Sequence, residues 1–141
     1  LVFATALADL SVGEVVVLPQ ARAVLGDLVW EAMMVSMGLG IRLEQFGEFD
    51  LTLFDKHKEA TVFDAMVAGS KDKIKNKTGV WRDIAIRKRP TEVDFIVGET
   101  VRRGEALGLS MTLNRRLVDM IHELERGSRT MNENNFVDLA G

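Results

Sequence analysis

Cysteine is absent from this sequence of 141 residues. The chain can therefore form neither a disulfide framework nor a thiolate metal site. No uninterrupted apolar run reaches the roughly 18 residues that a membrane-spanning helix needs, and the opening LVFATALADL lacks the basic flank of a signal peptide. We expect neither a membrane partner nor secretion, and cytoplasm is the default compartment.

Familiar site motifs are missing as well. The sequence has no glycine-rich dinucleotide fingerprint, no phosphate loop, no His-Glu-x-x-His and no serine nucleophile elbow. Of its two histidines, His57 stands between lysines, which favours a solvated side chain. His122 has Glu123 and Glu125 beside it, but no second ligand stands one helical turn away, so a surface histidine is favoured over a metal ligand. We predict no metal site.

The composition is that of a folded domain. Apolar residues make up 47% of the chain, charged residues 28%, and the mean hydropathy is +0.06. The length suits a single domain over residues 1–141 and is short for a nucleotide-binding domain joined to a substrate domain. Because the chain opens on Leu1 and its first ten residues have the pattern of the end of an apolar helix, we expect a piece of a longer protein.

Apolar residues recur at helical spacing in several stretches. Pro19 predicts a helix start, and the helix should end at Gly38 or Gly40. Two apolar stripes run along it, which predicts a helix buried on most sides or covered by another domain or subunit. A second helix is predicted over Glu59 to Lys73 and a surface loop over Ser70 to Thr78.

The last third predicts two further helices. One begins near Thr91 and runs to Leu107, and its Gly98 and Gly104 each cost about 1 kcal/mol relative to alanine, so we expect a close helix contact at both. The other is capped by Thr112 and ends at Gly127. The polar tail from Ser128 should fray. No stretch shows strand alternation, so the predicted fold class is all-α.

Charge is distributed unevenly along the chain. The net charge is −3, yet residues 71–90 carry eight Lys or Arg against two Asp. Such a segment favours a solvated face or a site for a small anion. It contains one aromatic residue, Trp81, and the rest of the chain is acidic, which argues against nucleic acid as a partner.

One run carries a resemblance to a known family. Residues 77–94 read KTGVWRDIAIRKRPTEVD, followed by Gly98, Gly104 and Gly108, then by LNRRL at 113–117 and IHELE at 121–125. This pattern resembles the C-terminal domain of ketopantoate reductase (2-dehydropantoate 2-reductase), of which the chain would be a divergent member. The resemblance implies a multi-helix bundle like the C-terminal domain of 6-phosphogluconate dehydrogenase.

In that family, the resemblance implies, a helical domain closes over an N-terminal Rossmann domain. NADPH passes a hydride to the keto carbon of a 2-keto acid in the pantothenate pathway, and a lysine protonates the alkoxide. The glutamate of the Thr-Glu-Val-Asp motif binds substrate, and that position here is Glu92. From the residues alone, the favoured interpretation of Glu92 is an acid in the first turn of a helix.

Several positions depart from the family pattern. The serine that contacts substrate falls on Gly79, or on Thr78 if the alignment shifts by one residue. The catalytic lysine should lie upstream of Leu1, so no catalytic residue is expected in this chain. The family's asparagines are missing or replaced, because no asparagine precedes Asn76. The scaffold is kept, while the actual substrate is left open.

The function predicted from the resemblance is that of one domain of a two-domain enzyme. The chain should bind a 2-keto acid as the substrate-capping domain of an NADP-dependent reductase, should be inactive without its Rossmann domain, and could form a homodimer. The alternative is a helical oligomerisation or interaction module that uses the apolar surface of Ala21 to Met37. A third reading is an anion-binding regulatory domain built on residues 71–90.

Overall fold

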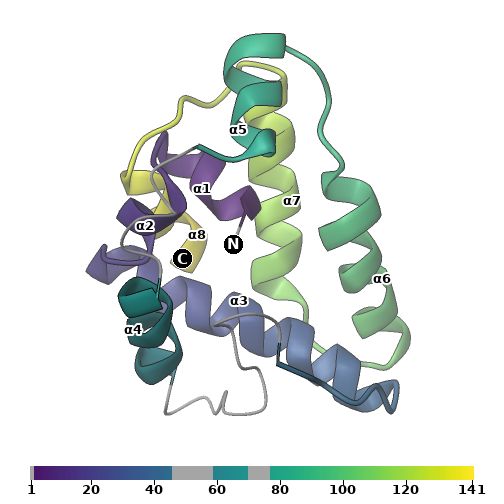
Figure 1. The fold of residues 1–141 in the computed structure, drawn as a ribbon. Helices are drawn as coiled ribbons and strands as arrows, with labels where there is room; N and C mark the ends of the chain where they lie inside the picture. Colours follow the sequence, from purple (N-terminus) through teal and green to yellow (C-terminus); the bar gives the residue numbers. More distant parts are fainter. Residues whose placement is uncertain (1, 46–58, 70–76) are drawn as a thin grey trace.

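A computed structural model describes residues 2–45, 59–69 and 77–141 of the chain, and every regular element in these ranges is a helix (Figure 1). The predicted all-α fold is confirmed. In chain order the elements are α1 (Val2–Ala8), α2 (Val12–Val15), α3 (Pro19–Gly38), α4 (Glu59–Gly69), α5 (Gly79–Arg82), the π-helical segments η2 (Asp83–Arg87) and η3 (Asp94–Gly98), α6 (Glu99–Ala106), α7 (Thr112–Glu125) and α8 (Asn134–Ala140).

The long helices α3 and α7 organise the bundle. α3 contacts α4, α6, α7 and α8, while α7 also contacts α1, η3 and α8 (Figure 1). The main core lies where these helices meet. Its fully buried large side chains include Leu7, Leu25, Phe63, Ile121, Phe136 and Leu139. None of the helices in the described ranges is long and apolar enough to cross a membrane.

α3 begins at Pro19 and ends at Gly38, as predicted. Its apolar stripes are largely part of the domain's own core, since Leu25, Leu28 and Met33 are buried. Met37, in the last turn of α3, is 59% exposed. The first of the two explanations for the wide apolar surface is therefore confirmed for most of the helix, and the predicted homodimer stays a prediction.

α7 has a cap that differs from the predicted one. Thr112 is the first helical residue, the N-cap position falls on Met111, and the Thr112 hydroxyl lies 3.0 Å from that of Ser110. Instead, the carboxylate of Glu31 on α3 accepts hydrogen bonds from the backbone N–H groups of Leu113 (3.0 Å) and Asn114 (2.9 Å). A cap supplied from 82 positions away leaves no local signal in the sequence. The predicted end is confirmed, because Gly127 has φ of +72°.

Gly98 and Gly104, the two glycines of the helix predicted from Thr91, behave differently. A Cβ added at Gly104 would lie 2.6 Å from Met111 Cγ and 2.9 Å from Val35 Cγ2, so the predicted close approach is confirmed there. At Gly98 the nearest atoms are 3.7 Å away and belong to Val93 and Asp94 of the same helical run. The prediction was wrong for Gly98, because the atoms nearest to an added Cβ there all belong to its own helical run.

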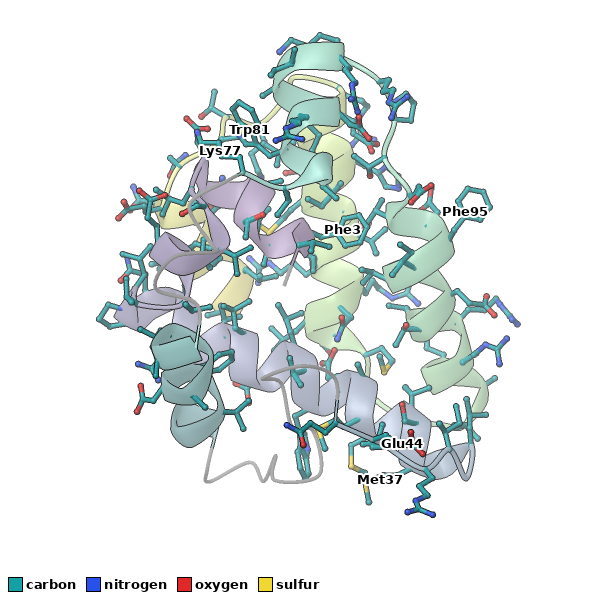
Figure 2. The ribbon with its side chains drawn as sticks, viewed as in Figure 1. Phe3, Met37, Glu44, Lys77, Trp81 and Phe95 are labelled. Atoms are coloured by element: carbon teal, nitrogen blue, oxygen red, sulfur yellow. The ribbon has the colours of Figure 1, made fainter. Side chains whose placement is uncertain are left out.

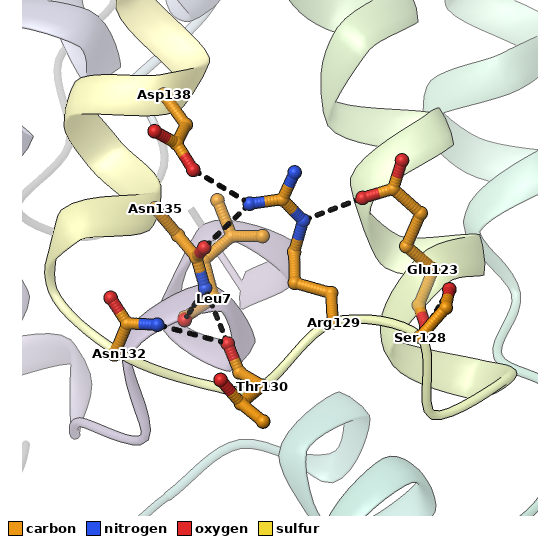
Figure 3. Close-up of polar contacts among 8 residues, drawn as sticks. All are labelled: Leu7, Glu123, Ser128, Arg129, Thr130, Asn132, Asn135 and Asp138. Atoms are coloured by element: carbon orange, nitrogen blue, oxygen red, sulfur yellow. Dashed lines mark hydrogen bonds and ion pairs between the residues drawn. The ribbon is translucent and has the colours of Figure 1, made fainter.

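The prediction that the tail from Ser128 frays was wrong. It folds back and forms α8, in which Phe136 and Leu139 are fully buried. Arg129 joins the tail to α7 and α8, donating to Glu123 Oε2 (2.6 Å), Asn135 Oδ1 (2.7 Å) and Asp138 Oδ2 (2.8 Å) (Figure 3). The polar residues that suggested fraying thus satisfy one another, while two apolar side chains enter the core.

Other boundaries moved slightly or lie outside the described residues. α1 confirms an apolar helix in the first ten residues. The helix predicted from Thr91 begins at Val93, and the one predicted over Glu59 to Lys73 is described only to Gly69. His57 and most of the loop predicted over Ser70 to Thr78 lie outside the described residues.

Candidate functional site

Thr78 begins the helix that follows the predicted loop. Its hydroxyl accepts a hydrogen bond from the backbone N–H of Trp81 (3.2 Å), which makes it the N-cap of α5. The same oxygen lies 3.1 Å from the hydroxyl of buried Thr5 and 3.3 Å from the carbonyl oxygen of Val2. These contacts join the start of α5 to α1 and set where Gly79 stands.

Asp9, directly after α1, holds the same segment from a second side. Its carboxylate pairs with the Lys77 ammonium and accepts a hydrogen bond from Trp81 Nε1 (2.5 Å), and Lys77 Nζ stands 4.3 Å from the centre of the Trp81 ring (Figure 2). The hydrogen bond from Lys77, helped by that from Trp81, lowers the pKa of Asp9 against the effect of burial. Asp9 has φ of +56°, a left-handed conformation that aims the carboxylate at both partners.

Residues 79–87 form a continuous helical run, which was not among the helices predicted from the sequence. Asp83 explains how the run ends. Its carboxylate accepts hydrogen bonds from Arg89 Nε (2.9 Å) and Arg87 Nη1 (2.8 Å), which lower its pKa, with Arg89 contributing most. Lys88 adopts a left-handed φ of +51°, and the chain then reverses toward η3. Arg87 and Arg89, which the sequence analysis counted in a basic segment with a solvated face, therefore stabilise a turn by binding Asp83.

Glu92 is the exposed residue just before the next helix. Its carbonyl oxygen accepts hydrogen bonds from the N–H groups of Phe95 and Ile96, both at 3.1 Å. Within the described part of the chain, the structure gives the Glu92 carboxylate no hydrogen bond or ion pair. Phe95 is 83% exposed and points away from the bundle (Figure 2). A charged acceptor and an apolar ring thus stand together on one open face.

His122 is partly buried and contacts two carboxylates. Its Nδ1 lies 2.8 Å from Glu125 Oε2 and its Nε2 2.9 Å from Asp94 Oδ1. Among residues 2–45, 59–69 and 77–141, no group of three or more His, Asp or Glu side chains has the arrangement to hold a metal ion. The histidine instead joins α7 to η3, next to Glu92.

The three residues predicted to bind substrate fall at the two ends of one helical run. Thr78 and Gly79 stand at its start, and Glu92 follows the turn at its far end. The nine residues of the run, 79–87, would span about 14 Å as regular helix, so no direct contact between the two groups is expected. After the turn, the chain descends beside α7 toward η3 (Figure 1), and η2 and η3 are both π-helical, a rare form that is common at functional sites.

Comparison with known proteins decides the family. The family model described as "Ketopantoate reductase PanE/ApbA C terminal" matches residues 3–125. The chain belongs to the ketopantoate reductase C-terminal domain family. The resemblance carried by residues 77–94 is thereby confirmed. No curated protein matches the chain.

A solved structure supports the same fold for this ketopantoate reductase domain. It is the crystal structure of a PanE/ApbA family ketopantoate reductase from Ralstonia eutropha JMP134, with a TM-score of 0.64 and 21% sequence identity. The match covers 89% of this chain and 39% of that chain. The chain therefore spans less than half the length of that relative.

Sequence reasoning missed the residues that hold the site in place. Asp9, Trp81 and Glu125 come from three separate segments of the ketopantoate reductase domain. Each looks like an ordinary polar or packing residue in the sequence, because its partner lies 34 to 72 positions away. Only Thr78, whose position before a helix is a usual N-cap signal, could have been identified locally.

Proposed function

We propose that this chain is the helical, substrate-binding domain of an NADP-dependent 2-keto acid reductase resembling ketopantoate reductase, and that it is inactive without a Rossmann domain. The observation that carries the proposal is the family match over residues 3–125. The sequence contains no dinucleotide fingerprint, so the nucleotide would be held mainly by the partner domain. The neighbour, of which this chain covers 39%, has ample length for such a domain.

In this proposal, NADPH supplies the hydride that reduces the keto carbon, and a lysine outside this chain supplies the proton. Glu92 accepts hydrogen bonds from substrate hydroxyl groups. Its exposed carboxylate has no other hydrogen bond among the described residues, so it can take up a ligand without first breaking a contact. The Thr78 hydroxyl already contacts Trp81, Thr5 and Val2, so it would exchange one of these contacts for a contact with substrate. At Gly79 nothing lies within 4 Å of an added Cβ, which leaves open space for substrate.

The second candidate is an oligomerisation module. Three apolar side chains at the end of α3 favour it, since Met37, Leu39 and Ile41 are 59%, 40% and 53% exposed. Light scattering separates the two functions. An oligomer that dissociates in the variant Met37→Ser/Ile41→Ser without loss of reductase activity would support self-association as an additional property. Oligomerisation in a protein without any reductase activity would favour the module.

The reductase proposal is tested with Glu92→Gln in the protein that joins this domain to its Rossmann domain. Removing the charge keeps the shape but weakens a charge-assisted hydrogen bond by about 1.5 to 3 kcal/mol. At about 1.4 kcal/mol per decade, kcat/KM should fall roughly ten- to hundredfold. Stability should change little, because an acid in a first turn contributes only about 0.3 to 1 kcal/mol through the helix dipole.

Glu133→Gln is the matched control. Glu133 is also an exposed glutamate at a helix start, before α8, and its side chain makes no capping hydrogen bond. Its replacement should leave the kinetics unchanged. If Glu92→Gln instead lowers stability while turnover and substrate affinity persist, Glu92 serves the helix start and the substrate role is wrong.

A further inference from the structure

One imidazole connects the segment that carries Glu92 to α7. Thr91, just before Glu92, donates its backbone N–H to Glu125 Oε1 (2.7 Å). Asp94, two residues after Glu92, has its Oδ1 2.9 Å from His122 Nε2, and His122 Nδ1 is 2.8 Å from Glu125 Oε2. We call Asp94, His122 and Glu125 the histidine clamp. It holds the chain on both sides of Glu92.

Glu92 itself is fixed by its backbone alone. Val93, the next residue, is fully buried, and its N–H lies 3.3 Å from Thr91 Oγ1 in a local cap. The carbonyl oxygen of Glu92 accepts the first hydrogen bonds of η3. A carboxylate on a segment with anchored neighbours loses little freedom when a ligand binds, which is how supporting residues raise affinity.

We propose that His122 is a positioning residue for Glu92: as an imidazolium it holds Asp94 and Glu125 together, and its loss of a proton opens the clamp and weakens substrate binding. The inference rests on the proposed function of Glu92. The physical reason is the number of donors. An imidazolium donates from both ring nitrogens, whereas a neutral imidazole donates from one. Both partners are carboxylates, so the neutral ring keeps only one of the two hydrogen bonds.

The charges around His122 favour the closed clamp. The charged groups that act on it are Glu125, one turn later on α7, and Asp94 from the facing η3. The hydrogen bond to Glu125, then that to Asp94, raises the pKa of His122 above its ordinary 6.5 despite burial. Burial raises the pKa of Glu125, but hydrogen bonds from Thr91 and His122 outweigh it and the net shift is downward. The clamp is therefore complete below pH 6.5 and opens as pH rises through the higher pKa of the folded state.

The test is the pH dependence of KM in the protein joined to its Rossmann domain. A 2-keto acid keeps its carboxylate charge from about pH 6 to 9, so the substrate does not titrate in this range. With the wild type, KM should rise about three- to tenfold above the pKa of His122, with kcat little changed. In His122→Asn, KM should be high throughout and independent of pH. The matched control is Arg126→Asn, an exposed change at the same end of α7, which should keep the wild-type profile.

A double-mutant cycle with Glu92→Gln separates the two proposals. If the clamp acts through Glu92, His122→Asn should add almost nothing in the Glu92→Gln background. A full, additive effect there, or a wild-type KM profile in His122→Asn, would overturn the clamp while leaving the substrate role of Glu92 intact. A silent Glu92→Gln would instead refute the proposed function on which the clamp rests.

A second variant guards against a simple loss of folding. Asp94→Asn keeps the shape of an exposed side chain but removes one of the two charges that stabilise the imidazolium. It should shift the inflection in KM to lower pH and preserve the melting temperature within a few degrees. If His122 has only a structural role, Asp94→Asn should lower the melting temperature. The inflection in its KM profile should then stay at the pH at which the wild type has it.

Discussion

Gly98→Ala and Gly104→Ala should change the stability of the domain in opposite directions. Both positions gain about 1 kcal/mol from the better helix propensity of alanine. At Gly98 the backbone is helical (φ −60°, ψ −39°) and the new methyl group would make only ordinary contacts at 3.7 Å or more, so the full gain of about 1 kcal/mol should appear. At Gly104 the methyl group would overlap Met111 and Val35, both buried. Overpacking there costs about 3 kcal/mol, for a net loss of about 2 kcal/mol.

Thermal unfolding followed by circular dichroism at the helical band measures both variants. For a domain of this size, 1 kcal/mol shifts the melting temperature by about 3 °C, so Gly98→Ala should melt about 3 °C higher and Gly104→Ala about 6 °C lower. In the Met111→Ala background, Gly104→Ala should cost less than it does in the wild type, because the side chain that meets the new methyl group is gone. If both single variants are stabilised, the close approach of α6 to α3 at Gly104 is refuted.

Two further changes test the long-range packing by urea denaturation. Glu31→Ala leaves the first N–H groups of α7 without their acceptor. It should lower the free energy of unfolding by about 2 kcal/mol, the upper range for a lost cap. A cost below about 0.5 kcal/mol would mean that water replaces the carboxylate. Phe136→Ala empties a fully buried site and should cost about 3 to 5 kcal/mol. Its neighbour Val137 is 59% exposed, so Val137→Ala should cost little. If Phe136→Ala and Val137→Ala both cost equally little, the tail frays after all.

Local chemistry in the sequence determined the helices and their ends. Pro19 and Gly127 act within one turn of the chain, so their effects on α3 and α7 could be predicted without any tertiary contact. The helical period of apolar residues likewise determined the all-α class. The family could be recognised because residues 77–94 keep a recognisable pattern at fixed spacing, although their helical run in the structure was not apparent from periodicity.

The tertiary structure decided which interchangeable-looking residues have specific roles. Gly98 and Gly104 have the same propensity, and only the position of Met111 distinguishes them. Thr112 looks like a cap, but Glu31 from α3 takes that place.

The same holds around the candidate site. His122 and Glu125 lie three residues apart in a polar stretch, and they become part of a clamp only because Asp94 and Thr91 are brought to them from about 30 positions away. Glu92 was identified from the family motif, whereas the support on both sides of it was not. Sequence patterns report forces within a helical turn, while hydrogen bonds and packing between distant segments exist only after the chain has folded.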